Sequence, residues 1–314
     1  MSEDARTAQR PSERGKAARD RKRLDTLLVE RGLAPSRERA RALIMAGAVR
    51  VNGATVTKAG TLVPRSASCE IAAAAAELRY ASRGGLKLER ALDVFGLDPS
   101  GRVCLDVGAS TGGFTDVLLR RGAARVYAVD VGHGQLAWTL RTDPRVVVMD
   151  RTNIRHLAAL PEPVDCAVVD VSFISLRLVL PRVAALLAPG GWVVALVKPQ
   201  FEAGRADADR GAGIISDPAV HRRVLRELLA ELQADDAAST ADGLRLAARA
   251  LVPSPITGRE GNREYLLWLV AGARDEQAAP GGTALGEEEI AAMVAEAFGQ
   301  SSTNPSPAGT TGGR

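Results

Sequence analysis

The chain has 314 residues, of which 46% are hydrophobic and 25% charged, a composition typical of a folded protein with a substantial core. It contains no apolar run of about 18 residues, and its charged N-terminus lacks an apolar signal segment, so we expect a cytoplasmic protein without a membrane span. The three cysteines, Cys69, Cys104 and Cys166, lack metal-ligand spacing, so we expect them to be reduced and no metal to be bound.

Charge is distributed unevenly along the chain. Residues 1–87 carry 18 Lys and Arg against 9 Asp and Glu, whereas the remainder carries 23 against 28. A basic segment of this kind attracts polyanions, because contacts with phosphates release counterions. Within it, residues 1–21 show no apolar periodicity and are predicted to form a disordered basic tail.

Residues 22–80 are predicted to form a small α+β domain. Leucines at helical spacing indicate a helix that begins at Lys22 and stops at Gly32, and Ser36 is a suitable N-cap for a second helix. The pair Asn52-Gly53 between two short apolar runs predicts a tight β-hairpin. Two helices and a hairpin form a compact module that is too small to be an enzyme on its own.

Basic side chains gather on these elements, within the pattern RLD..L...G...SR..A...I..G.V.VNG. This pattern resembles the RNA-binding module named after ribosomal small-subunit protein four. The resemblance implies that the module holds structured RNA by its backbone and shape. The implied RNA-binding residues are Arg23, Arg37, Arg39, Arg41, Arg50 and Lys58. The alternative interpretation is a solvated, charged helix face.

Residues 81–273 alternate between apolar strand-like runs and amphipathic helical segments. The expected strands are 102–107, 125–130, 145–150, 164–170, 192–198, 244–252 and 264–270. The alternation predicts an α/β fold, with a parallel sheet covered by helices on both faces. Ligands of such sheets bind beyond the carboxyl ends of the strands, where Asp106, Asp130, Asp150, Asp170 and Lys198 are expected. Residues 274–314 are predicted to form an acidic helix and a disordered tail.

The first of these strands leads into LDVGASTGGFTDVLL, a glycine-rich turn followed by a helix. Its glycines allow close approach to a ligand, but the spacing G-x-x-x-G-G disfavours a dinucleotide site and hence a dehydrogenase. With the acid that follows the next strand, the turn resembles the cofactor site of the Rossmann-like methyltransferases. The resemblance implies a seven-stranded sheet and S-adenosyl-L-methionine, bound by Asp106, Gly108, Ser110, Gly112, Gly113, Phe114, Asp130 and Asp150.

Four ionisable residues lie at element edges around this expected pocket, namely Lys87, Asp170, Lys198 and Glu264. The set resembles that of the FtsJ-like ribose 2′-O-methyltransferases. A ribose hydroxyl is a weak acid, so its proton must be removed as the oxygen attacks the methyl group, and a lysine can remove it only when neutral. We assign Lys198 as the base, Asp170 and Lys87 as groups that set its charge and orient the hydroxyl, and Glu264 as a positioning group for Lys87 or the ribose.

The order of the front module, SRGG-x-K, DVGASTGGFTDVLL, DVSFISL, VKPQFE and GN-x-EYL is similar to that of the TlyA family, often labelled hemolysin A, over residues 22–272. The resemblance implies 2′-O-methylation of cytidine in 23S ribosomal RNA and, in some members, also in 16S RNA. A complete first helix favours the members that modify both RNAs. The implied partners are ribosomal RNA or ribosomal subunits. His133 stands where members often carry an aromatic residue, and we assign it no role.

Two other functions remain open from the sequence. An RNA-binding ribosome-assembly protein with a vestigial methyltransferase fold is disfavoured only because the four ionisable residues and the glycine turn are intact. A secreted pore-forming toxin would need an export signal or a long amphipathic membrane-inserting segment, and the sequence shows neither.

Overall fold

The computed structural model describes residues 21–34, 36–45, 47–71, 79–204, 213–233, 245–258, 260–272 and 285–299. Residues 1–20 and 300–314, where the sequence predicts disordered tails, lie outside these ranges. The chain divides into two compact units, Met1–Ser82 and Arg83–Arg314. The sequence predicts this boundary at residue 80.

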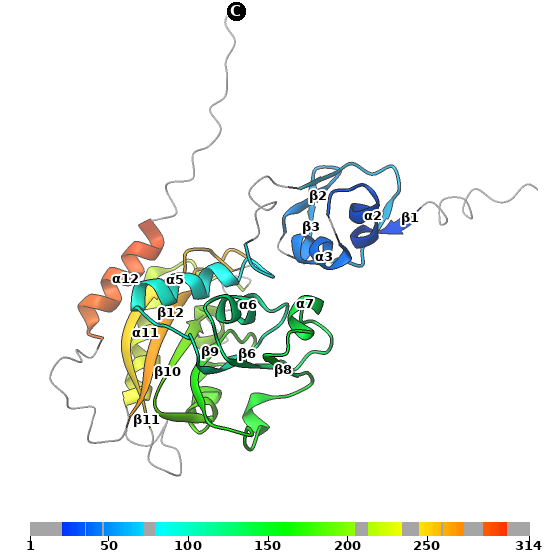
Figure 1. Ribbon diagram of the computed structural model, residues 1–314. Helices are drawn as coiled ribbons and strands as arrows, with labels where there is room; N and C mark the ends of the chain where they lie inside the picture. Colours follow the sequence, from blue (N-terminus) through cyan, green and yellow to red (C-terminus); the bar gives the residue numbers. More distant parts are fainter. Residues whose placement is uncertain are drawn as a thin grey trace, which may run out of the picture. The chain divides into compact units, whose positions relative to one another are not determined.

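The first unit contains two helices and short strands (Figure 1). Its elements are β1 Arg21–Arg23, α2 Leu24–Glu30, α3 Arg37–Met45, β2 Val49–Val51, β3 Ala54–Val56, β4 Leu62–Pro64 and β5 Cys69–Ile71. Helices α2 and α3 pack together over a leucine-rich core. The β2–β3 turn has positive φ at Asn52 (49°) and Gly53 (81°), as its sequence predicts.

The start of the first helix differs from the sequence-based expectation. Residues Arg21–Arg23 form strand β1, which pairs with β4, and helix α2 begins only at Leu24. Arg23 has an extended backbone (φ −60°, ψ 134°), so the chain enters the helix from a strand. The three-residue strands β1, β4 and β5 are too short to show a period in the sequence, and they were not predicted.

The second unit is built around a seven-stranded sheet in the order β11-β12-β10-β9-β6-β7-β8. The strands are β6 Val103–Val107, β7 Arg125–Val129, β8 Val146–Met149, β9 Val164–Val169, β10 Leu187–Val197, β11 Arg245–Pro253 and β12 Tyr265–Gly272. Strands β8, β7, β6, β9 and β10 pair in parallel. Strand β12 is antiparallel to both β10 and β11. The sequence predicted a parallel sheet, but the observed sheet is only mostly parallel.

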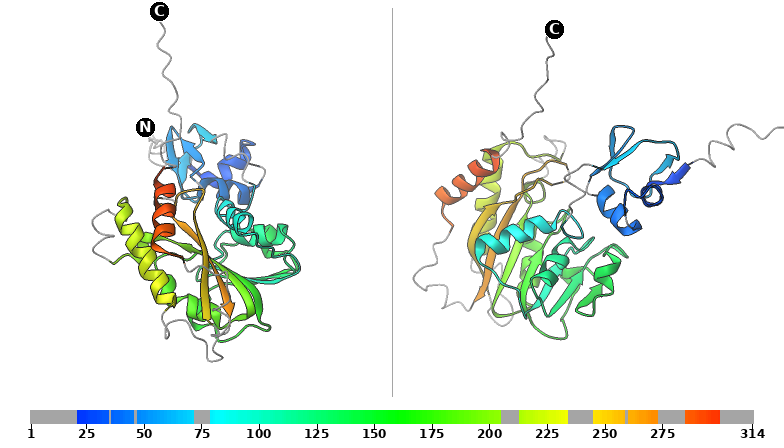
Figure 2. Two further views of the ribbon diagram at one scale, coloured as in Figure 1. Left: turned by 90° about the vertical axis from the view of Figure 1, so that its left-hand side faces the viewer. Right: turned by 45° about the horizontal axis from the view of Figure 1, so that its top comes forward.

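Helices cover both faces of this sheet, with α11 and α12 on one face and α5 and α6 on the other (Figure 2, left). The helices are α5 Gly85–Phe95, α6 Gly113–Arg120, α7 Trp138–Arg141, α8 Leu180–Ala184, α9 Pro199–Glu202, α11 Pro218–Gln233 and α12 Glu287–Gly299, with 3-10 turns η1 Ile154–His156 and η2 Leu176–Leu178. The valine-rich runs of β9 and β10 suit strands that are buried on both faces.

Helix α12 belongs to the core of the second unit, although residues 274–314 were predicted to form a separate acidic helix and tail. Its apolar residues Ile290, Val294 and Ala297 recur at helical spacing and are buried in the same core cluster as the central strands. The first turn of α12 is acidic, which complements the positive end of the helix dipole.

The antiparallel strand β12 has a direct consequence for the site. Its first residue, Tyr265, pairs with Val197, the last residue of β10. Strand β12 therefore begins at the edge where the parallel strands end. Lys198, just after β10, and Glu264, just before β12, consequently lie at neighbouring positions on this edge.

Candidate active site

The turn after β6 has the conformation that its glycines predict. Gly108 has φ 86°, and a Cβ added there would lie 2.3 Å from the carbonyl oxygen of Asp170 at the end of β9. Gly112 has φ 93°, and a Cβ there would meet a methyl of Leu140 at 2.3 Å. Only glycine fits either position, so the turn is held close against its neighbours at the carboxyl edge.

Within the described part of the chain, Asp106 in β6 has one carboxylate oxygen with a hydrogen-bond partner and one without. Its side chain is fully buried, and Oδ2 accepts a hydrogen bond from the Thr115 hydroxyl at 2.6 Å. Among the described residues, Oδ1 has no hydrogen-bond partner. Burial, reinforced by the nearby charges of Asp170 and Asp130, raises the pKa of Asp106 to about 7. An unpartnered buried carboxylate oxygen fits a cationic group, such as the amino or sulfonium group of S-adenosylmethionine.

Asp130 organises the glycine turn and the loop after β7. Its Oδ2 accepts from the backbone N–H of Ser110 at 2.8 Å, and its Oδ1 accepts from that of Gly132 at 2.7 Å. Ser110 itself has a positive φ of 48°. Each carboxylate oxygen can accept a second bond, so Asp130 keeps acceptor capacity for ribose hydroxyls.

One carboxylate oxygen of Asp150 is occupied by protein groups in the structure. Its Oδ2 lies 2.6 Å from the Arg141 guanidinium, 3.1 Å from His133 Nδ1 and 3.1 Å from the backbone N–H of Gly134. The Arg141 hydrogen bond is the main reason that the pKa of Asp150 is lowered. Asp150 therefore braces the loop after β7. The ring of Phe114, another predicted cofactor residue, is buried.

The four predicted catalytic residues form two ion pairs. Lys198 Nζ lies 2.6 Å from Asp170 Oδ1 and donates to the Ser172 hydroxyl at 2.9 Å. Lys87, from the first turn of α5, forms an ion pair with Glu264, and both side chains are less than 10% exposed. Glu264 thus contacts Lys87, as expected if it positions that lysine, one of the two roles that the sequence left open. Asp170, Lys198 and Glu264 lie at the ends of the neighbouring strands β9, β10 and β12, whereas Lys87 belongs to α5.

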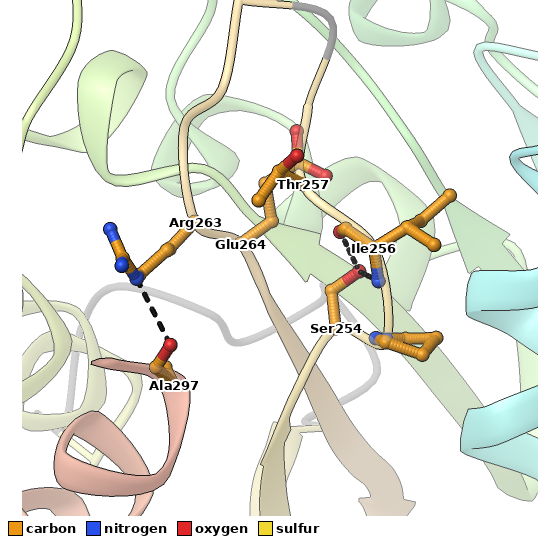
Figure 3. A pocket seen from close by; sticks show the side chains of 7 residues that line it. Ser254, Ile256, Thr257, Arg263, Glu264 and Ala297 are labelled. Carbon is orange, nitrogen blue, oxygen red and sulfur yellow. Dashed lines mark hydrogen bonds between the residues drawn. The ribbon is translucent and has the colours of Figure 1, made fainter. Parts of the chain in front are cut away.

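A small cavity of about 120 Å³ lies beside Glu264. It is lined by Ser254, Pro255, Ile256, Thr257, Arg263, Glu264 and Ala297 (Figure 3). Arg263 points away from Glu264 and donates to the carbonyl of Ala297 in α12 at 3.0 Å. The hydroxyl-bearing segment Ser254–Thr257 was not predicted to belong to the site, because it has no charge and no periodic pattern.

A buried polar network holds the start of β12. Asn262 accepts from the N–H of Ile215 at 2.9 Å and donates to the carbonyl of Gly213 at 2.8 Å. His221, on α11, contacts the Ile215 carbonyl at 2.9 Å and the Tyr265 hydroxyl at 2.8 Å. Because a carbonyl only accepts, the proton lies on Nε2 of His221, and Tyr265 donates to Nδ1. Burial lowers the pKa of His221, which favours this neutral form.

In the first unit, the predicted RNA-binding residues fall into two groups. Arg23 and Arg37 contact the fully buried Asp25, at 2.8 Å and 3.4 Å, so each has a structural task while its side chain remains about half exposed. The remaining cations are Arg41, Arg50 and Lys58, which are exposed, and Arg39, which is half-buried. The exposed cations suit contact with phosphates.

The part of the chain that the structure describes contains no helix long and apolar enough to cross a membrane. Within the same residues, no group of three or more His, Cys, Asp or Glu side chains could hold a metal ion.

Replacing Asp106 with asparagine tests the role of its burial. A carboxylate whose folded-state pKa is raised destabilises the fold as pH rises from about 4 through 7, because the folded state holds the proton more tightly. Relative to the variant, the wild type should therefore lose roughly 2–3 kcal/mol between pH 5 and pH 8. Thermal unfolding of the ligand-free proteins measures this gap. A gap that stays constant with pH would contradict the assignment.

A mostly parallel sheet, a glycine turn after a central strand and acidic residues at the strand ends together define a Rossmann-like methyltransferase fold. The FtsJ-like methyltransferase family matches residues 80–271, and the S4 domain matches residues 22–67. The chain therefore belongs to the FtsJ-like methyltransferase family and, by the full-length relatives described next, to its TlyA group.

YqxC of Bacillus subtilis is 47% identical over 283 residues, which cover 88% of this chain and 94% of YqxC. The 16S/23S rRNA (cytidine-2′-O)-methyltransferase TlyA of Mycobacterium tuberculosis is 46% identical over 251 residues, or 79% of this chain and 90% of TlyA. A solved structure described as a hemolysin from Streptococcus thermophilus is 41% identical, with a TM-score of 0.65 over 90% of this chain and 97% of that one.

Proposed function

We propose that the chain transfers a methyl group from S-adenosylmethionine to the ribose 2′-hydroxyl of cytidine in ribosomal RNA. The observation that carries this proposal is the pair of lysine–carboxylate contacts, Lys198–Asp170 and Lys87–Glu264, at the sheet edge that also bears the glycine turn. The 46% identity to a relative named for this reaction supports the choice of cytidine, of 23S RNA and also of 16S RNA. The proposed compartment is the cytoplasm, where ribosomes are assembled.

The cofactor site is proposed from the residues around the glycine turn. Asp106 offers its unpartnered oxygen to a cationic group, and Asp130 offers acceptor capacity to ribose hydroxyls. When bound, S-adenosylmethionine supplies an electrophilic methyl group on a positively charged sulfur. Gly108 and Gly112 let the turn pack closely against Asp170 and Leu140, which fixes the turn at the carboxyl edge of the sheet.

The chain's own catalytic task is to remove a proton from a weak acid. Lys198 is 8% exposed, and its Nζ is held by Asp170 and Ser172. In its neutral form, Lys198 takes the 2′-hydroxyl proton and becomes an ammonium, which Asp170 stabilises. Because Lys87 is already paired with Glu264, its charge is partly balanced, and we assign the pair to orienting the ribose.

An exposed aromatic residue beside this centre fits a nucleic-acid substrate. Phe173, three residues after Asp170, is 91% exposed, and its ring lies 5.0 Å from that of Phe201 at an angle of 48°. Proteins recognise unstacked RNA bases by stacking them on such aromatic rings. We therefore propose that Phe173 contacts the base of the target nucleotide.

The Phe173→Ala variant should methylate RNA with a kcat/KM about 5- to 160-fold below that of the wild type, because base–aromatic stacking is worth ~1–3 kcal/mol. Its melting temperature should hardly change, since the ring is exposed. Leu178→Ala, which removes another exposed apolar side chain from the same region, is the matched control and should remain active. Equal activity of the wild type and both variants would exclude the stacking role.

Labelled S-adenosylmethionine incubated with separate ribosomal subunits that lack this methylation provides the test of the function. We expect label in the RNA of the large subunit and also of the small subunit, and mass spectrometry of the digested nucleosides should find it on the ribose of cytidine. Label on a base, or none in either subunit, would overturn the proposal. The second result would favour a ribosome-assembly protein with a vestigial methyltransferase fold.

A further inference from the structure

Glu202 lies at the end of α9, four residues after the proposed base Lys198. Its side chain is 2% exposed. Its Oε2 accepts from the Ser175 hydroxyl at 2.5 Å, and its Oε1 accepts from the backbone N–H of Leu176 at 2.7 Å. Both donors belong to the segment that follows Asp170, so one carboxylate joins the two chain segments that leave β9 and β10.

Together with the catalytic ion pair, this contact closes a ring of interactions. At the sheet edge, Lys198 contacts Asp170 and Ser172. At the far end of the same two segments, Glu202 contacts Ser175 and Leu176. The position of residues 170–176 relative to residues 198–202 is thus fixed at both ends.

Backbone strain within this ring shows why a second anchor is needed. Phe173 has φ 64°, in the left-handed region that bulky residues rarely adopt. Its ring is 91% exposed, so burial does not hold it there. A strained residue persists only when its surroundings impose its conformation. The flanking contacts, Lys198–Ser172 before it and Glu202–Ser175 after it, are placed to do so.

We call the two hydrogen bonds from Ser175 and Leu176 to Glu202 the clamp, and the surroundings of Glu202 keep it in place. Burial raises the pKa of this carboxyl group, whereas the Leu176 and Ser175 hydrogen bonds favour its charged form. The Arg177 guanidinium lies 4.0 Å away and also pairs with Glu227 and Glu231 of α11. An ionisable side chain is costly to bury unless it is hydrogen-bonded, so both donors are needed to keep it there.

We propose that Glu202 is a positioning residue for methyl transfer. By clamping the 3-10 turn η2 to α9, it sets the geometry of Lys198 against Asp170 and the direction of Phe173. The inference rests on the proposed function for its kinetic consequence, whereas the clamp itself is measurable without activity.

The test compares Glu202→Ala, Glu202→Gln and Ser175→Ala with the wild type and with Glu231→Ala, which removes a different carboxylate partner of Arg177. Glu202→Ala should lower kcat about 10- to 100-fold, because small misplacements of reacting groups are costly, with cofactor affinity within about twofold of wild type. Glu202→Gln should recover part of this loss, since its amide oxygen still accepts one bond. Ser175→Ala should show a smaller loss, and Glu231→Ala none.

Hydrogen–deuterium exchange supplies the activity-independent measurement. The Leu176 amide should exchange faster in Glu202→Ala than in the wild type, and at the wild-type rate in Glu231→Ala. If exchange accelerates while kcat stays at the wild-type value, or if Glu231→Ala loses as much activity as Glu202→Ala, the positioning role is wrong. If the wild type methylates no RNA, the proposed function fails, whereas accelerated exchange at Leu176 still supports the clamp.

Discussion

Lys198→Ala should lower kcat for methyl transfer by about 10²- to 10⁴-fold, the usual contribution of a positioned general base. Without the amine, no group at the end of β10 can take the 2′-hydroxyl proton. Cofactor affinity should change little, because the glycine turn and Asp106 lie on a different strand end. The rate of methylation of the ribosomal subunit that serves as substrate measures the loss of activity. Calorimetric titration with the cofactor measures its affinity.

Lys198→Arg distinguishes the role of Lys198 as a proton acceptor from the role of its positive charge. A guanidinium keeps the positive charge and can still pair with Asp170, but it is not deprotonated in proteins. We therefore expect this variant to be as inactive as Lys198→Ala while remaining as stable as the wild type. Activity in the arginine variant above about a tenth of the wild-type value would show that Lys198 acts through its charge and not as a base.

Glu264→Ala should destabilise the second unit by about 3–5 kcal/mol, because it leaves the buried Lys87 ammonium without its partner. The Lys87 and Glu264 side chains are 9% and 3% exposed, so the ammonium has little contact with bulk water to replace its lost partner. Chemical denaturation measures the free energy of unfolding. Asp93→Ala, which breaks the exposed pair with Arg121, is the matched control and should cost at most about 1 kcal/mol.

The double variant Lys87→Met, Glu264→Leu distinguishes stability from function at the same position. Replacing both members of a buried ion pair by apolar residues of similar size is often neutral, so stability should recover. Methyl transfer should stay low, because the pair that we assign to orienting the ribose is gone. A stable double variant with wild-type kcat would remove Lys87 and Glu264 from the proposed mechanism.

Local patterns in the sequence predicted most of the fold. The apolar runs marked all seven strands of the large sheet, and Asn52-Gly53 marked the hairpin, because strand periodicity and turn conformation depend on near neighbours in the chain. The glycine spacing after β6 disfavoured a dehydrogenase, and the family that matches this unit is a methyltransferase family. The first helix was placed two residues early, since a three-residue strand such as Arg21–Arg23 carries no period.

Contacts between distant segments were beyond such patterns. Lys87 and Glu264 are 177 residues apart and meet only because β12 runs antiparallel to β10, which places its first residues at the ligand edge. In the sequence, Glu202 is a charged residue at the end of VKPQFE with no sign of a special role. Its burial against Ser175 depends on how the segments after β9 and β10 pack together. The sequence by itself determined which residues can do the chemistry. Only the tertiary structure decided which of them are paired, because strand direction and loop packing arise from contacts across the whole unit.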